Sequence, residues 1–140
     1  ESRLNYTVIG DGVNLASRIE GLTRVYGVPV IVCEATRAAA AGFEFLELDR
    51  VRVKGKQNVE RIFMPLDGAA MGGDLRLRHD DALSAYRERA WDVAAETFTA
   101  LRRENPDLAE LYDLYLQRIA EYRRTPPPPD WDGAASYDKK

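Results

Sequence analysis

Asn14 and Arg18 are the residues whose types and spacing are best suited to bind a small anionic ligand. They lie four residues apart, directly after the turn Gly10-Asp11-Gly12. On a helix, residues four apart project from the same face, one turn from each other. A helix N-terminus favours anions, and a guanidinium forms strong hydrogen bonds to phosphate oxygens. The amide and the guanidinium together therefore predict a receptor for a sugar and a phosphate.

The residues around this pair predict a strand, a glycine turn and a helix. Thr7 to Ile9 is apolar or β-branched, and beyond the turn apolar residues recur at helical spacing as far as Tyr26. Asp11 is suited to cap the start of this helix, and Gly27 is suited to end it in a left-handed conformation. An ordinary solvated helix start would show the same features, so these elements alone leave both interpretations open.

The full string of residues resembles the class III nucleotidyl cyclases, the adenylate and guanylate cyclases. The second half of their catalytic domain carries a pattern like G-D-x-V-N-x-A-S-R. The residues that match it are Gly10, Asp11, Val13, Asn14, Ala16, Ser17 and Arg18. The resemblance implies that Asn14 holds the ribose and that Arg18 stabilises charge on the α-phosphate while the 3′-oxygen attacks.

A second stretch is similar to the same family. Leu48 to Lys56 reads L-D-R-V-R-V-K-G-K, like the late cyclase hairpin in which a lysine reaches the triphosphate. By position that lysine is Lys54, with Lys56 as the alternative. A flexible ammonium acts as a point charge and suits a polyphosphate. Outside the family context, Lys54 would be read as a solvated turn lysine.

The resemblance also places Thr7 at a position that helps to select the base. Many adenylate cyclases have an aspartate there, whereas this chain has a threonine, as many bacterial members do. A hydroxyl both donates and accepts hydrogen bonds, so it discriminates between purines less sharply than a carboxylate. A β-branched residue chosen for its strand is an equally good interpretation of Thr7. Adenine is favoured over guanine.

The metal-binding part of the family pattern does not occur in this sequence. Family members hold two Mg²⁺ or Mn²⁺ ions on two aspartates of the first half of the domain, one of them in a string like F-x-D-x-x-G-F-T. Asp11 and Asp49 are not substitutes, because one is suited to cap a helix and the other lies in a predicted strand. The chain begins at Glu1 without Met, which suggests a cut through a domain. We expect the parent protein to be an enzyme and this chain alone to be inactive.

Further along, the pattern predicts a strand over Val28 to Cys33 and a short helix over Glu34 to Ala41, closed by Gly42. Phe43 to Val53 and Val59 to Leu66 are expected to form a hairpin of two strands. The single cysteine, Cys33, excludes an internal disulfide; it fits a reducing compartment and a buried position in a strand.

The predicted domain organisation has four parts. Residues 1–66 form the C-terminal half of the cyclase domain, 67–79 a linker, 80–125 a helical extension, and 126–140 a proline-rich tail. Apolar residues from Leu83 to Leu101 and from Leu108 to Tyr122 form two helical sets separated by Asn105-Pro106. The extension resembles one tetratricopeptide repeat with a following helix. Helices followed by a polyproline segment and W-D-G resemble the tails of bacterial cyclases with a CHASE-type sensor.

Composition limits the remaining alternatives. The chain has 140 residues, 45% hydrophobic and 31% charged, with a net charge of −3, which fits a soluble globular domain with an appendage. No basic stripe indicates nucleic-acid or membrane-surface binding, and no apolar run has the length of a membrane span.

The overall expectation is an α+β fold: part of a ferredoxin-like cyclase domain followed by a helical hairpin. The resemblance implies a parent lyase that converts ATP to 3′,5′-cyclic AMP and pyrophosphate in intracellular signal transduction. It implies a homodimer, with metals from one protomer and the Asn/Arg helix from the other. It also implies the cytoplasmic portion of a protein that is anchored in a membrane. The alternatives are a catalytically inactive cyclase-like regulatory module and an independent protein-interaction module in the helical extension.

Overall fold

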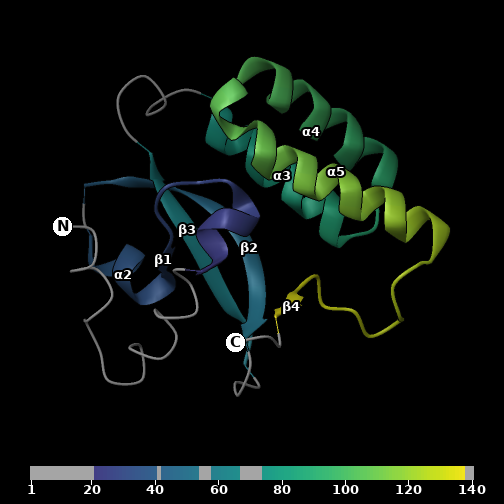
Figure 1. The fold of residues 1–140 in the computed structure, drawn as a ribbon, viewed down its shortest axis with the longest axis horizontal. Helices are drawn as coiled ribbons and strands as arrows, with labels where there is room; N and C mark the ends of the chain where they lie inside the picture. The colour runs from purple at the N-terminus through teal and green to yellow at the C-terminus, as the bar shows by residue number, and fades with distance from the viewer. Residues whose placement is uncertain (1–20, 41, 54–57, 67–73, 138–140) are drawn as a thin grey trace. The chain divides into compact units, whose positions relative to one another are not determined.

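The computed structural model describes residues 21–40, 42–53, 58–66 and 74–137. The chain divides into two compact units. One comprises Glu1–Met71 together with Ala134–Lys140, and the other comprises Gly72–Gly133. We call them the sheet unit and the helical unit, and Figure 1 shows both.

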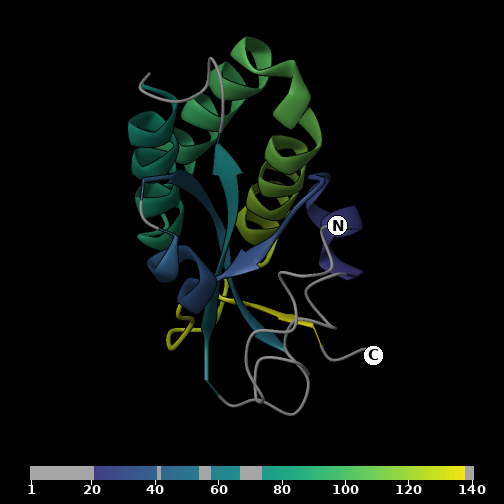
Figure 2. The ribbon, with the colours of Figure 1, turned by 90° about the vertical axis from the view of Figure 1, so that its left-hand side faces the viewer.

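The sheet unit is built on a four-stranded sheet with the order β1-β3-β2-β4. Strands β1 (Val32–Cys33) and β2 (Glu44–Val53) both pair antiparallel with β3 (Glu60–Leu66). Strand β4 (Ala135–Tyr137) pairs with β2 in parallel. Figure 2 shows the long β2 and β3 ribbons side by side. The predicted hairpin of two strands is therefore confirmed for its described residues.

One face of this sheet is covered by helical residues 21–26, which bury Leu22 and Tyr26. They end at Gly27, whose φ of 68° is the left-handed conformation predicted for it. The sheet contributes its own apolar side chains to the core, and the fully buried ones are Leu46, Leu48, Val51 and Ile62. Helix α2 (Glu34–Ala39) follows β1 directly.

Three expectations about this unit were wrong in detail. The strand expected over Val28 to Cys33 is only the two residues of β1. Pro29 lies in the part that is not a strand, and it lacks the N–H that a ladder hydrogen bond needs. Phe43, expected to belong to the strand after Gly42, lies just before β2 and is exposed. Cys33 is in the strand as expected but only half-buried, with Sγ 3.5 Å from Oγ1 of Thr36.

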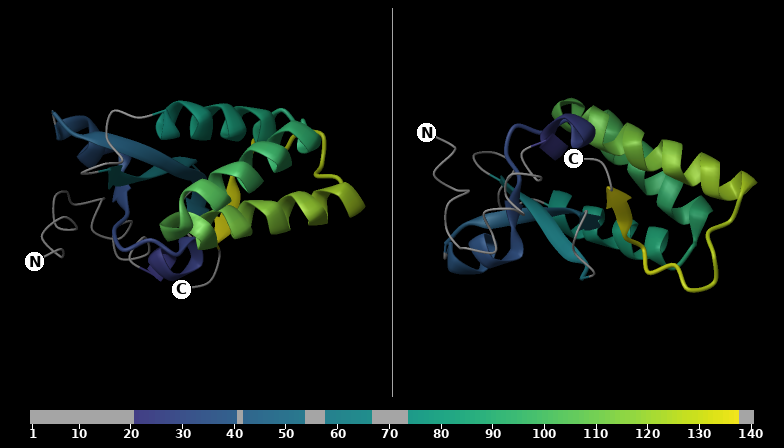
Figure 3. Two further views of the ribbon diagram at one scale, coloured as in Figure 1. Left: turned by 90° about the horizontal axis from the view of Figure 1, so that it is seen from above. Right: turned by 60° about the horizontal axis from the view of Figure 1, so that its bottom comes forward.

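The helical unit contains α3 (Leu75–Arg87), α4 (Trp91–Glu104) and α5 (Ala109–Arg124), and a 3-10 turn (Pro106–Leu108) precedes α5. The three helices lie side by side (Figure 3). They bury residues at helical spacing, such as Ala94, Phe98 and Leu101 of α4. Among the described residues, no helix has the length and apolar character needed to cross a membrane.

The helices differ from the sequence expectation at two places. The first helix begins at Leu75, not at Asp80, because Leu75 and His79 are buried and belong to its inward face. The apolar set from Leu83 to Leu101 is divided between α3 and α4, with a break after Arg87. Arg89 in this break has a φ of 65°, which no helix residue adopts.

The tail after α5 packs against the helices of its own unit. Arg89 donates hydrogen bonds to the carbonyl oxygens of Pro127 and Pro128. The Trp131 ring lies 5.1 Å from Tyr122 and 5.9 Å from Trp91, measured between ring centroids. The segment Pro126–Pro128 is neither helix nor strand, and a turn follows at 129–130. Strand β4, which lies within the range 126–140 expected to be the proline-rich tail, was not expected from the sequence.

Candidate functional site

The four residues singled out by the sequence, Thr7, Asn14, Arg18 and Lys54, lie outside the described residues. Their roles therefore stay predictions. The described elements adjoin them in the chain. Helical residues 21–26 follow Arg18 closely, and β2 ends at Val53, the residue immediately before Lys54. The structure thus describes the elements that adjoin the predicted helix start and the predicted lysine turn.

A buried hydrogen bond joins these two elements. The Tyr26 hydroxyl donates to Oδ2 of Asp49 over 2.5 Å. Both side chains are fully buried. The backbone N–H of Arg50 donates to the second carboxylate oxygen, Oδ1, over 2.8 Å. Asp49 thus accepts hydrogen bonds on both oxygens, which offsets the loss of water that burial of a carboxylate requires.

Asp49 faces inward because of an irregularity in β2. The register between β2 and β3 shifts between Glu47 and Asp49, as at a β-bulge. Leu46 is buried before the shift, Leu48 at the shift itself, and Asp49 and Val51 after it. Asp49 therefore occupies a core position that an apolar residue would normally fill.

Strand β4 brings a third side chain to this pair. The hydroxyls of Tyr137 and Tyr26 are 3.0 Å apart, and their rings meet edge to face at 6.3 Å between centroids. Because the one Tyr26 hydroxyl proton points to Asp49, the Tyr137 hydroxyl is the donor to Tyr26. We call these three residues the Tyr26–Asp49–Tyr137 cluster.

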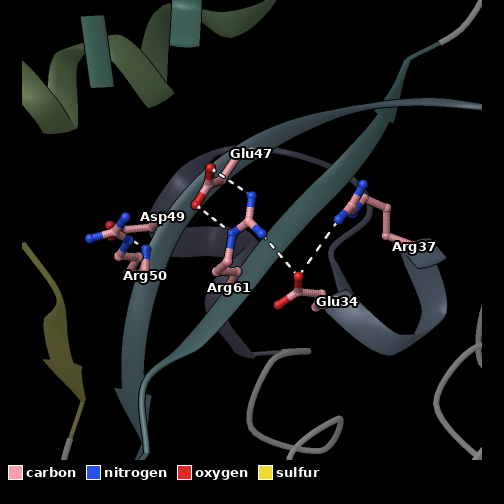
Figure 4. Close-up of polar contacts among 6 residues, drawn as sticks. All are labelled: Glu34, Arg37, Glu47, Asp49, Arg50 and Arg61. Carbon is pink, nitrogen blue, oxygen red and sulfur yellow. Dashed lines mark hydrogen bonds and ion pairs between the residues drawn. The ribbon is translucent and has the colours of Figure 1, made fainter. Parts of the chain in front are cut away.

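A second polar group lies on β2, β3 and α2 (Figure 4). Arg61 donates to both carboxylate oxygens of Glu47, over 3.2 and 3.3 Å, and to Glu34 over 2.9 Å. Arg37 lies 3.6 Å from the same Glu34 oxygen. The pKa of Arg61 is raised, chiefly by the hydrogen bonds that its guanidinium donates to Glu47. Both guanidinium groups also lie over the Phe63 ring. These arginines already pair with carboxylates, so the group is a structural network and not an open anion site.

The described residues contain no group of three or more His, Cys, Asp or Glu side chains arranged to hold a metal ion. Asp49 is not an open ligand, since its carboxylate is fully buried and accepts from Tyr26 and Arg50.

Sequence reasoning identified Tyr26 as a member of the buried helix face but did not identify its partner. Asp49 had been set aside as a strand residue, and Tyr137 was assigned to the tail. One signal was present. Alternate residues of a strand face the same side of the sheet, so the pattern places Asp49 on the side of Val51 and Val53 and not on that of the arginines between them. No comparable sequence signal points to Tyr137.

Three adenylate cyclases are similar to parts of this chain. An adenylate cyclase from Anabaena cylindrica is 42% identical over 66 residues, which is 44% of this chain and 13% of that protein. The terminal-differentiation specific adenylate cyclase from Dictyostelium discoideum is 36% identical over 134 residues, covering 89% of this chain and 6% of its own length. Adenylate cyclase 1 from Rhizobium meliloti is 36% identical over 64 residues, covering 45% of this chain and 10% of its own length.

These three similarities show that the chain contains an adenylate cyclase-like region. The chain spans only 6 to 13% of the length of these relatives. No family model matches the sequence. No solved structure matches it either.

Proposed function

We propose that this chain supplies one half of a class III adenylate cyclase site, which converts ATP to 3′,5′-cyclic AMP and pyrophosphate. The string from Gly10 to Arg18 carries the proposal. It is supported by three adenylate cyclases that are 36 to 42% identical over parts of the chain. In this proposal the sheet unit is part of a ferredoxin-like cyclase domain.

Each proposed residue acts through its own chemistry. Asn14 holds the ribose by hydrogen bonds, and Thr7 meets the edge of the base. Arg18 stabilises the charge that develops on the α-phosphate, a contact that is strongest in the transition state. Lys54 holds the terminal phosphates, with Lys56 as the alternative.

Bound divalent metal ions would activate the 3′-hydroxyl and neutralise the leaving pyrophosphate. We assign their ligands to residues outside this sequence. The complete site then needs a second cyclase protomer or half-domain, with metal ligands on one side and Asn14 and Arg18 on the other. In the same proposal the parent is a signalling protein whose cyclase portion is cytoplasmic. The helical unit is its repeat-like extension, which begins within the range 67–79 first expected to be a linker.

The experiment combines this chain with a metal-bearing half-domain of a class III cyclase and measures cyclic AMP made from ATP with Mg²⁺ or Mn²⁺. We expect no product from the chain alone and product from the mixture. The metal-bearing half, combined with its own natural second half, provides the positive control. If that control is active and the mixture is not, the chain is a non-catalytic cyclase-like module, and the proposal is wrong.

A further inference from the structure

The Tyr26–Asp49–Tyr137 cluster joins three parts of the chain that are far apart in sequence. Tyr26 comes from helical residues 21–26, Asp49 from β2 and Tyr137 from β4. Tyr26 and Asp49 have no exposed surface. The hydroxyl-to-carboxylate distance is 2.5 Å and the hydroxyl-to-hydroxyl distance is 3.0 Å.

A buried hydrogen-bonded cluster restricts the relative position of the elements that it joins more than apolar packing does. An apolar contact tolerates small displacements of the two surfaces, whereas a hydrogen bond weakens steeply outside a narrow range of distance and angle. A buried carboxylate that loses its donors is left with an unmet desolvation penalty. The helical residues and β2 are therefore held in one relative arrangement.

The cluster lies close in sequence to the residues that the proposed function uses. Tyr26 follows Arg18 by eight residues, on the predicted helix, and Asp49 precedes Lys54 by five. Strand β4 pairs with β2 up to its last residue, with Tyr137 opposite Val53, the neighbour of Lys54. Tyr26 thus bonds to side chains of β2 and β4, two strands that pair with each other as far as Val53.

We propose that Tyr26, Asp49 and Tyr137 are positioning residues for the cyclase reaction. They hold helical residues 21–26, which continue the predicted helix of Asn14 and Arg18, at a fixed distance from β2, which ends at Val53, just before Lys54. The α-phosphate and the terminal phosphates of one ATP molecule can then be bound at the same time. This inference rests on the proposed function, and it gives strand β4 a part in the reaction.

The test uses the full chain combined with the metal-bearing half-domain, and it compares Tyr26→Phe, Asp49→Asn and Tyr137→Phe with the wild type. Each variant keeps the shape of the side chain. Tyr122→Phe is the matched control, since it removes a hydroxyl from the helical unit. We expect kcat per folded molecule to fall about 10-fold or more in Tyr26→Phe, as misplaced contacts reduce the rate strongly. KM for ATP should change less than threefold.

Asp49→Asn retains a carbonyl oxygen that can accept from Tyr26, so it should lose less activity than Asp49→Leu. A merely structural role would lower the melting temperature without changing kcat per folded molecule. Unchanged kcat in all three cluster variants, with an active wild type, would overturn the positioning role and leave the proposed function intact.

A second measurement decides the inference even if the wild-type mixture makes no cyclic AMP. Amide hydrogen exchange is measured on the chain alone, at a temperature where every variant is folded. We expect Tyr26→Phe and Tyr137→Phe to speed exchange in residues 21–26 and in Arg50–Val53, and Tyr122→Phe to leave it unchanged. Unaltered exchange in both segments would show that the cluster does not hold them together. An inactive wild type by itself would contradict only the proposed function.

Discussion

Tyr112 places a phenol hydroxyl in the core of the helical unit. Its side chain is fully buried, and the hydroxyl lies 2.9 Å from Nδ1 of His79 in α3, which is also fully buried. Burial raises the pKa of Tyr112 above its ordinary value, because a buried site disfavours the charged phenolate. The folded helical unit therefore favours the neutral form of Tyr112.

This raised pKa predicts a loss of stability at alkaline pH. Above about pH 10 the unfolded chain loses the Tyr112 proton while the folded chain retains it, so the stabilisation is complete below that pH and declines above it. Relative to Tyr112→Phe, the free energy of unfolding of the wild type should fall by about 1.4 kcal/mol per pH unit above pH 10. Urea titrations at several pH values measure this difference, with Tyr122→Phe as the control. Parallel curves for wild type and Tyr112→Phe would contradict it.

At the scale of residues, the sequence predicts which side chains face the core better than it predicts their partners. Helical spacing predicted the burial of Tyr26, and strand parity was available for Asp49. The bond between them depends on how a helix packs on a sheet, which periodicity does not report. Tyr137 belongs to the same cluster although it follows Tyr26 by 111 residues. A local sequence pattern does not predict a contact between residues so far apart in the chain.

At the scale of elements, close contacts hold the segment after α5 against the helices of its own unit. Gly133 has a φ of 84°, and a Cβ built there would lie 2.8 Å from Cγ of Arg87. Arg89 and Trp131 anchor the same tail, and the Arg89 guanidinium lies 5.5 Å from the centre of the Trp131 ring. The close approach at Gly133 leaves no room for a side chain.

Gly133→Ala should therefore destabilise the helical unit. Gly42→Ala is the matched control, since Gly42 has a similar φ of 88° but open space around its Cα. The left-handed conformation costs each alanine about 1 to 2 kcal/mol, and crowding against Arg87 should add about 1 kcal/mol or more at position 133. Thermal unfolding followed by far-UV circular dichroism, to which both units contribute, measures both variants. Equal losses of stability in Gly133→Ala and Gly42→Ala would show that the Arg87 side chain moves away from the added methyl group at no energetic cost.

The elements that the sequence predicted correctly are those with local signals. Alternating residues and a glycine-lysine turn predicted the β2–β3 hairpin, and Gly27 predicted the helix end. Strand β4 was missed because its three residues, Ala135–Tyr137, form a strand only by pairing with β2. The break between α3 and α4 was missed because the apolar spacing continues across it.

At the scale of the whole molecule, one of the similarities extends over most of the chain. The match to the Dictyostelium discoideum protein covers 89% of this chain, so it includes most of both units. The other two matches cover 44 and 45% of the chain.

The central claim is that Arg18 contacts the reacting phosphate, and Arg18→Ala in the reconstituted cyclase tests it most directly. Arg24→Ala is the matched control, because Arg24 is an exposed arginine on the same predicted helix. Loss of a transition-state charge contact costs about 3 kcal/mol. We therefore predict that kcat for cyclic AMP formation falls about a hundredfold or more in Arg18→Ala and stays at the wild-type value in Arg24→Ala. A rate within a few-fold of the wild type in Arg18→Ala would show that Arg18 is a surface residue, and the cyclase assignment of this motif would fail.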